Sequence, residues 1–483
     1  MENLGKEDEE FWSSGMTADL ITKVAGAGLI RVAPLDDILK LDKDLSIEEK
    51  AEKLRVKYIL THSFLIKNDG FDLWCKLENI ETGIALFSNK ISEPMDMTTQ
   101  MVGKLANDIV TSLKVETKQD MMEAPTANVE AYKYYLEAKY ILRNRGSIQD
   151  TEVARGLLKK AIDLDDSLIS ANILVGYVYR EKDNFVKALE TFSIALDKAN
   201  KINDHIGIGQ ILSNIGIVHD ITRDYKRGLD YHKRSLKISE DINDKLSIAR
   251  SLQNLGTNYY LRGEQKKALE YHKRSLEIYE KIGDRYKMRG NLNNLGIDYD
   301  ALGDADKALE YFFSSLKINE KIGDKIGEGK CLHNIGGVYK DKGDYDKALD
   351  YLTQMENMCK AIGYNRGLAN TLNNIGTIYY AKTEFKKAEK YFTKAVDLQK
   401  EIEFKRGLTT NLNLNFVKKK IGVKYSKKEV NQILSEKEDI SFDLNYHLYE
   451  FLEDITYIKT AYNQVQELAD NLEPDVAAKF LSY

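Results

Sequence analysis

The feature that most constrains the fold of this 483-residue chain is a repeat with a period of 40 residues. Glycines recur at this interval, at Gly176, Gly216, Gly256, Gly296, Gly336 and Gly376. A small residue follows each of them twelve positions later, at Ala188, Gly228, Ala268, Ala308, Ala348 and Ala388. Tyrosines form a third column, at Tyr231, Tyr271, Tyr311, Tyr351 and Tyr391. Such a fixed period is typical of proteins built from stacked repeats.

Each repeat reads as two helices that cannot bury their apolar faces alone. Within the unit Ser251–Gly290, the apolar residues Leu252, Leu255 and Tyr259 fall at helical spacing. Gly263 then interrupts the pattern, and a second helical stripe follows before the next unit begins. Neighbouring units bury these stripes jointly when they stack. The small residues are expected where two helices approach each other closely.

The repeats resemble those of the tetratricopeptide family. The segment NNLGIDY at Asn293–Tyr299 and the segment ADKALEYF at Ala305–Phe312 carry the resemblance, although the 40-residue unit is longer than the family's unit of about 34 residues. The resemblance covers residues 129–424, with an irregular first unit around Gly146 and a last unit that degrades at Phe416. It implies a mainly α fold, a right-handed solenoid that binds a protein or peptide on its concave face.

Residues before Pro125 follow a different pattern, which predicts a small α/β domain at residues 1–115 and a linker at 116–128. Alternating apolar residues and intervening turns predict strands at Tyr58–Ile66, Phe71–Ile80 and Ala85–Ile91, with a further short strand at Leu29–Val32. Helical spacing predicts helices at Thr17–Val24, Ile47–Leu54 and Met97–Leu113.

This domain resembles the TolB-type amino-terminal domain, through EEFWSSGMTADLIT at Glu9–Thr22 and the strand segment Lys57–Gly83. The family's first hydrophobic strand is missing ahead of Glu2. Either the chain is a fragment of a longer protein, which we favour, or the sheet lacks one edge. The resemblance then implies an upstream effector, such as a nucleotide cyclase, a Ser/Thr kinase or a DNA-binding domain.

The C-terminal region, residues 425–483, is predicted to form a helical cap on the last repeat. Ser426 and Glu429 have the spacing of a capping box. A longer helix is predicted at Leu444–Leu472. Proline is absent between Pro125 and Pro474, which permits uninterrupted helices throughout the repeats.

Composition narrows the class of protein. The chain has 71 basic and 76 acidic residues, so the sequence gives no reason to expect nucleic-acid binding. No apolar run reaches the length of a membrane-spanning helix. The separated Cys75, Cys331 and Cys359 are typical of a reducing compartment and favour a cytoplasmic protein. The two family resemblances imply a bacterial one.

The sequence carries no recognisable catalytic or cofactor motif, so we predict that the chain is not an enzyme and binds no cofactor or metal. His232 and His272 share one repeat position and form the strongest metal candidate. Phe312 and Phe392 occupy the same column, which favours a packing role for both histidines.

The asparagine column is the candidate binding site. It lies two residues before each glycine and comprises Asn214, Asn254, Asn294, Asn334 and Asn374. In the resembled family this position lies near the concave face, where an amide can bond to the backbone of an extended peptide. Alternatively, each asparagine bonds to a neighbouring helix and stabilises the stack. Variable positions nearby are expected to supply specificity, chiefly Arg250, Gln253, Asn293, Lys330, Tyr260 and Tyr380.

Two functions follow from these patterns. The first is a non-catalytic scaffold that captures a partner protein or peptide. The second is the regulatory or sensory portion of a larger bacterial signalling protein, with its effector domain upstream.

Overall fold

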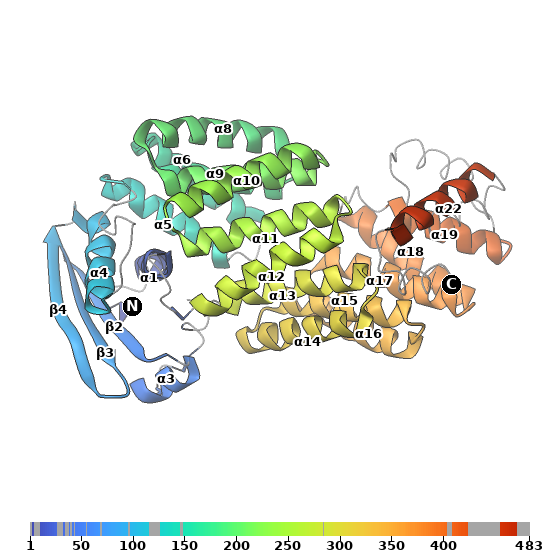
Figure 1. The fold of residues 1–483 in the computed structure, drawn as a ribbon, viewed down its shortest axis with the longest axis horizontal. Helices are drawn as coiled ribbons and strands as arrows, with labels where there is room; N and C mark the ends of the chain where they lie inside the picture. The colour runs from blue at the N-terminus through green and yellow to red at the C-terminus, as the bar shows by residue number, and fades with distance from the viewer. Residues whose placement is uncertain are drawn as a thin grey trace. The chain divides into compact units, whose positions relative to one another are not determined.

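The computed structural model describes residues 2–3, 10–26, 32–33, 38, 41–42, 44–54, 56–67, 70–94, 97–114, 126–144, 148–283, 285–402, 408–423 and 455–470. The chain divides into two compact units. The first comprises Met1–Arg262 with Glu270–Met288, and the second comprises Gly263–Leu269 with Arg289–Tyr483. Figure 1 labels their helices and strands.

The first unit begins with a four-stranded sheet in the order β1-β2-β3-β4. Its strands are β1 (Glu2–Asn3), β2 (Tyr58–Lys67), β3 (Gly70–Asn79) and β4 (Ile84–Pro94). The three long strands are antiparallel, and all three were predicted from the alternation of apolar residues. The two-residue β1 pairs parallel with β2 at one edge of the sheet.

Within the described residues, three helices accompany the sheet: α1 (Glu10–Gly26), α3 (Ile47–Leu54) and α4 (Thr98–Ser112). Helix α3 has the predicted bounds and α4 is one residue shorter at each end. Helix α1 begins seven residues before the predicted Thr17, because the aromatic pair Phe11–Trp12 is buried as part of its first turns. The predicted strand at residues 29–32 lies outside the described residues except for Val32, which is not in a strand.

Helix pairs follow the sheet domain in both units. In the first unit they are α5 (Val129–Asn144), α6 (Ile148–Leu164), α7 (Ile169–Glu181), α8 (Phe185–Ile202), α9 (His205–Ile221), α10 (Tyr225–Asp241), α11 (Lys245–Leu261) and most of α12 (Gln265–Ile282). In the second unit they are α13 (Arg285–Ala301, from Arg289 on), α14 (Ala305–Ile322), α15 (Lys325–Asp341), α16 (Tyr345–Ala361), α17 (Asn365–Ala381), α18 (Phe385–Glu401) and α19 (Leu408–Lys420). The fold class is therefore as predicted, a repeat solenoid preceded by a small α/β domain.

The C-terminal cap lies largely outside the described residues. This applies to the predicted capping box at Ser426 and Glu429. The predicted long helix is described only as α22 (Ile455–Asp470). No described helix is long and apolar enough to cross a membrane.

Local sequence explains the boundary between the two helices of a repeat. Asp224, Asp304 and Asp344 each precede a second helix and accept a hydrogen bond from the backbone N–H three residues later. Just before two of these caps, Gly303 and Gly343 have φ angles of 78° and 77°, a region that glycine adopts without strain.

The glycine column makes room for a bulky side chain of the following helix. A Cβ atom at Gly296 would lie 2.5 Å from the ring of Phe312, and one at Gly256 would lie 2.5 Å from the ring of His272. His272 is 2% exposed, and His232 is fully buried beside Gly216. This placement supports a packing role for the two histidines.

One side of each stack is formed by the first helices of the pairs, which we call the A helices. In the first unit α7 contacts α9 and α9 contacts α11, and in the second unit α15 contacts α17 and α17 contacts α19. Successive A helices are therefore direct neighbours within each stack.

Candidate functional site

All predicted site residues lie on A helices. Helix α9 carries Asn214, and α11 carries Arg250, Gln253, Asn254 and Tyr260. In the second unit α13 carries Asn293 and Asn294, α15 carries Lys330 and Asn334, and α17 carries Asn374 and Tyr380. Lys330 is exposed and the others are half-buried, as expected for side chains at a groove wall.

In the second unit, the asparagines form a ladder that links successive A helices. The Nδ2 atom of Asn334 donates to Oδ1 of Asn293 at 2.9 Å, and Nδ2 of Asn374 lies 3.4 Å from Nε2 of His333. Asn413 of α19 continues the pattern with a 3.2 Å bond to Oδ1 of Asn373. Three of the four A helices in this unit are thus bonded to the one before them.

The first unit repeats this arrangement on α9 and α11. Nδ2 of Asn254 donates to Oγ of Ser213 at 2.8 Å. Asn214 bonds back to the carbonyl of Gln210 and accepts a 2.8 Å hydrogen bond from Arg180 of α7. The amide nitrogens of Asn254, Asn334 and Asn374 therefore link neighbouring helices, as the second interpretation of the sequence proposed, whereas that of Asn214 bonds within its own helix.

The amide oxygens are used differently. Within the described part of the chain, Oδ1 of Asn254 and Oδ1 of Asn334 have no hydrogen-bond partner. Neither atom is a buried unsatisfied group, so each remains accessible. A carbonyl oxygen in this state can accept an N–H from a ligand backbone. Asn294 does have a partner, so the opportunity differs between repeats.

The imidazole of His333, which belongs to this ladder, is held in its uncharged form. Burial and the nearby positive charge of Lys340 lower the pKa of His333. The imidazole is therefore uncharged near neutral pH and can accept the hydrogen bond of Asn374. A protonated ring would lose this acceptor.

Arg180, Ser213 and Asn413 of the ladder were missing from the predicted site, whereas His333 and Asn373 share the column of the predicted Gln253 and Asn293. Asn413 shares the column of Asn373, 40 residues on, and the repeat period identifies it once α19 is counted as an A helix. Arg180 has no such signal, because its column holds no constant residue type. The other members of that column are Asp220, Tyr260, Asp300, Lys340 and Tyr380.

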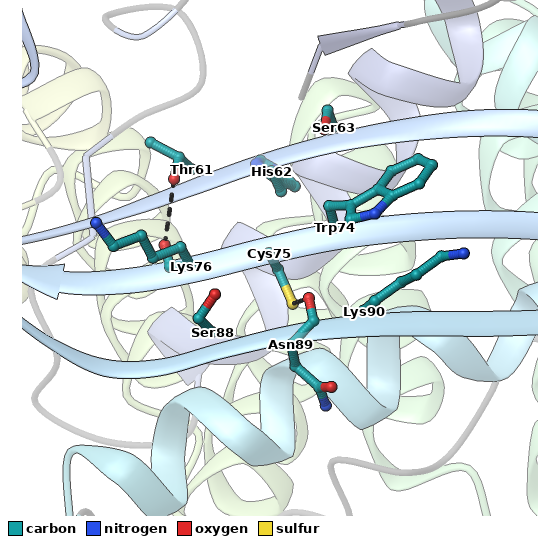
Figure 2. A pocket seen from close by; sticks show the side chains of 9 residues that line it. All are labelled: Thr61, His62, Ser63, Trp74, Cys75, Lys76, Ser88, Asn89 and Lys90. Atoms are coloured by element: carbon teal, nitrogen blue, oxygen red, sulfur yellow. Dashed lines mark hydrogen bonds between the residues drawn. The ribbon is translucent and has the colours of Figure 1, made fainter.

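Apart from the asparagine ladder, a hollow with a volume of about 420 Å³ lies on the sheet (Figure 2). Trp74 and Lys90 lie side by side there, with the Lys90 ammonium 5.1 Å from the ring centroid. Lys90 also pairs with Asp72 at 3.2 Å, and Lys76 pairs with Glu78 at 2.6 Å. Both cations are already neutralised, so this wide hollow is not organised for an anionic ligand.

Comparison with known families identifies the repeats. Residues 166–241, 221–281, 288–361 and 332–401 match the tetratricopeptide repeat family model. These residues are therefore tetratricopeptide repeats, and the predicted repeat class is confirmed. A comparison with curated proteins found no match.

One solved structure shares the fold, and two others show a weaker likeness. A Rap protein complexed with Competence and Sporulation Factor is 15% identical, with 71% of this chain and 100% of that chain covered and a TM-score of 0.52. The quorum sensor NprR from B. thuringiensis is 14% identical over 71% of this chain and 97% of that chain, with a TM-score of 0.47. A signal transduction ATPase with a tetratricopeptide repeat sensor from Pyrococcus horikoshii is 16% identical over 88% and 69%, with a TM-score of 0.47. The TolB-type resemblance of the sheet domain stays a prediction.

Proposed function

We propose that the A helices bind an extended segment of a partner protein, with the asparagine column as the main-chain contact. The chain is then a protein-interaction or regulatory repeat protein rather than an enzyme. The observation that carries the proposal is that the nitrogen and the oxygen of the asparagine side-chain amides have different roles. Their nitrogens link neighbouring helices, while the oxygens of Asn254 and Asn334 remain accessible acceptors within their respective units.

The ladder also supports the proposal by making the acceptors rigid. An amide that already donates to the preceding helix has its orientation set before a ligand arrives, which reduces the entropy lost on binding. Main-chain contacts of this kind give affinity, and side chains around them give specificity. Lys330, Arg250 and Tyr380 would read the side chains of the partner.

The Rap structure is consistent with this proposal, since it holds a bound factor on the same fold. We extend this to the present chain as a proposal about the class of partner, a protein or peptide. A regulatory role within a larger cytoplasmic signalling protein agrees with the same site and is the second reading of the sequence.

The first experiment locates the binding face. A photo-crosslinking amino acid replaces Lys330 of α15 in one variant and Lys317 of α14 in the control, since Lys317 is also exposed but lies on a second helix. We expect crosslinks to a partner from position 330 only, identified by mass spectrometry. Equal crosslinking from both positions would contradict the proposed face.

Substitutions at Asn334 then distinguish the role of the amide oxygen from that of the amide nitrogen. Asn334→Asp keeps an acceptor oxygen, and the amide of Asn293 can turn over to donate to it. Asn334→Ala removes the acceptor, so we expect affinity for the identified partner to fall about 2- to 13-fold, the value of one net hydrogen bond. Isothermal calorimetry on both variants, at temperatures where each is folded, gives the answer. An alanine variant that binds like the wild type would assign the column to the scaffold alone.

A further inference from the structure

The edge of the sheet at β4 carries a second surface of interest. Strand β4 has only one neighbour among the described strands, β3, and most of its residues are exposed. A hollow of about 440 Å³ runs between β4 and α4, and it is lined by Asn89, Lys90, Ile91, Ser92, Glu93, Lys104, Asn107 and Asp108. An edge strand of eleven residues offers unpaired backbone donors and acceptors to another strand.

Helix α4 runs antiparallel to β4, which sets where its charges lie. Lys104 forms an ion pair with Glu93 near the end of β4. Asp108 lines the hollow together with Asn89, and burial together with the charge of Asp108 raises the pKa of the Cys75 thiol, whose partner across the sheet is Asn89. Lys104 thus lies against residue 93 and Asp108 against residue 89, one helical turn apart on the side of α4 that faces the hollow.

Lys104 has an oppositely charged partner in Glu93, whereas Asp108 has no such partner among the described residues. Among the described residues it makes no ion pair or hydrogen bond, and burial raises the pKa of its carboxyl group. A partly buried, unpaired carboxylate is unfavourable unless a cation approaches. The nearest place for one is the open side of the hollow.

We infer that two copies of this chain associate through their β4 edges, antiparallel about a two-fold axis near Ile91. Asn89 then lies opposite Glu93 of the second copy, and Lys90 lies opposite Ser92, so no like charges meet along the strands. The two α4 helices become antiparallel neighbours. Lys104 of each copy reaches Asp108 of the other.

Self-complementarity is the reason to expect a second copy rather than a foreign strand. A two-fold interface uses the same patch on both sides, so each charge must meet its opposite within one sequence. A cation and an anion one turn apart on a helix meet this condition when two such helices run antiparallel. The pairing joins two open sheets into one and removes both edges. It concerns only the sheet domain and does not depend on the proposed binding of a partner by the repeats.

The test is the molar mass of the full chain by sedimentation equilibrium over a concentration series. We expect a concentration-dependent approach to twice the 55.2 kDa of one chain. Lys104→Asp and Asp108→Lys each place two like-charged pairs at the axis, so each variant should weaken self-association by more than about tenfold. Lys53→Asp, on the exposed side of α3, is the matched control and should associate like the wild type.

Mixing the two variants gives the sharpest outcome. The Lys104→Asp copy has an acidic side chain at both positions, and the Asp108→Lys copy has a basic side chain at both. Both pairs across the axis of the mixed dimer are therefore opposite in charge, and a heterodimer should form. Dimers of the single variants as strong as wild type, or a mixture that stays monomeric, would overturn the inference. So would a wild-type chain that remains monomeric throughout the series.

A second measurement avoids any change at Lys104, whose loss could affect its pair with Glu93. Asn107→Cys lies beside the axis on the exposed surface of α4. A short bismaleimide should link two copies of this variant covalently, while Lys53→Cys should stay unlinked under the same conditions. Equal linking of both variants, or of neither, counts against the interface.

Discussion

Single residues in this protein act in pairs that span two helices. A glycine in the middle of a helix costs about 1 kcal/mol relative to alanine. At Gly296 this cost is offset because the ring of Phe312 occupies the space of the missing side chain. At Gly336 the same space is taken by Leu352, so the device tolerates different partners. The glycine and the residue sixteen positions later form one structural unit.

A pair of alanine substitutions tests this interpretation. Gly296→Ala should lower the free energy of unfolding by about 1–3 kcal/mol, because its Cβ atom would overlap Phe312 in a packed core. Gly337→Ala is the control, since a Cβ atom there meets nothing within 4 Å. That variant should be neutral or gain up to about 1 kcal/mol from helix propensity. Chemical denaturation of both variants checks the opposite signs. A stabilising Gly296→Ala would show that the ring moves away freely.

At the scale of elements, helix α1 joins the sheet domain to the repeats. Trp12 of α1 packs against Phe71 of the sheet and against Tyr132 of α5. The side chain of Asp19 accepts hydrogen bonds from Tyr132 at 2.7 Å and from Lys139 at 2.6 Å. The residues of the sheet, α1, α4, α5 and α6 belong to one hydrophobic core. The sheet domain therefore caps the first helix pair, as solenoids require at their ends.

Replacement of Asp19 probes this junction. Asp19→Asn removes the ion pair with Lys139 but keeps an oxygen for Tyr132. We expect a loss of about 1.5–3 kcal/mol, the value of a hydrogen bond between charged groups that are largely buried. Glu152→Gln is the comparison, because the side chains of Glu152 and of its partners Arg155 and Lys182 are each at least a third exposed, so these pairs should together contribute less than about 1 kcal/mol. Thermal unfolding followed by circular dichroism compares the two. Equal effects would mean that the Asp19 contact is no stronger than a surface pair.

At the scale of the whole molecule, stability arises from contacts between neighbouring repeats, and buried histidines make it dependent on pH. Burial lowers the pKa of His62 and of His219, and burial together with the charge of Lys340 lowers that of His333. These groups take up protons more readily in the unfolded chain, whose histidines titrate near pH 6.5. The unfolded state therefore gains protons first as the pH falls.

The sign of the effect follows by linkage. The stability that the three neutral histidines contribute is fully present above about pH 6.5. It is lost as the pH falls from there toward their lowered pKa values in the folded state. Asp300 acts in the opposite direction, since burial and the charge of Asp341 raise its pKa to about 6. We expect the midpoint of urea unfolding to fall between about pH 7.5 and about pH 5.5. His62→Gln with His333→Gln should reduce that fall relative to wild type. An unchanged pH dependence in the double variant would exclude these histidines as its source.

The sequence by itself determined the repeat and its elements. Periodic glycines, small residues and tyrosines depend on helix geometry within one unit, so they predicted helix pairs over residues 129–424, of which 166–281 and 288–401 match the repeat family. Alternation and turn residues likewise placed β2, β3 and β4. Residues such as Asn334 could be assigned to one column by the same period.

Only the tertiary structure decided what the columns touch. The donor of Asn334 lies on one helix and its acceptor Asn293 on another, so their pairing depends on how the A helices stack. The early start of α1 and its shared core with α5 depend on contacts between residues more than a hundred positions apart, such as Asp19 with Tyr132. The charge arrangement of Lys104 and Asp108 beside β4 has the same origin. Local patterns specify which face of a helix is apolar, whereas packing specifies which polar groups remain available to a partner.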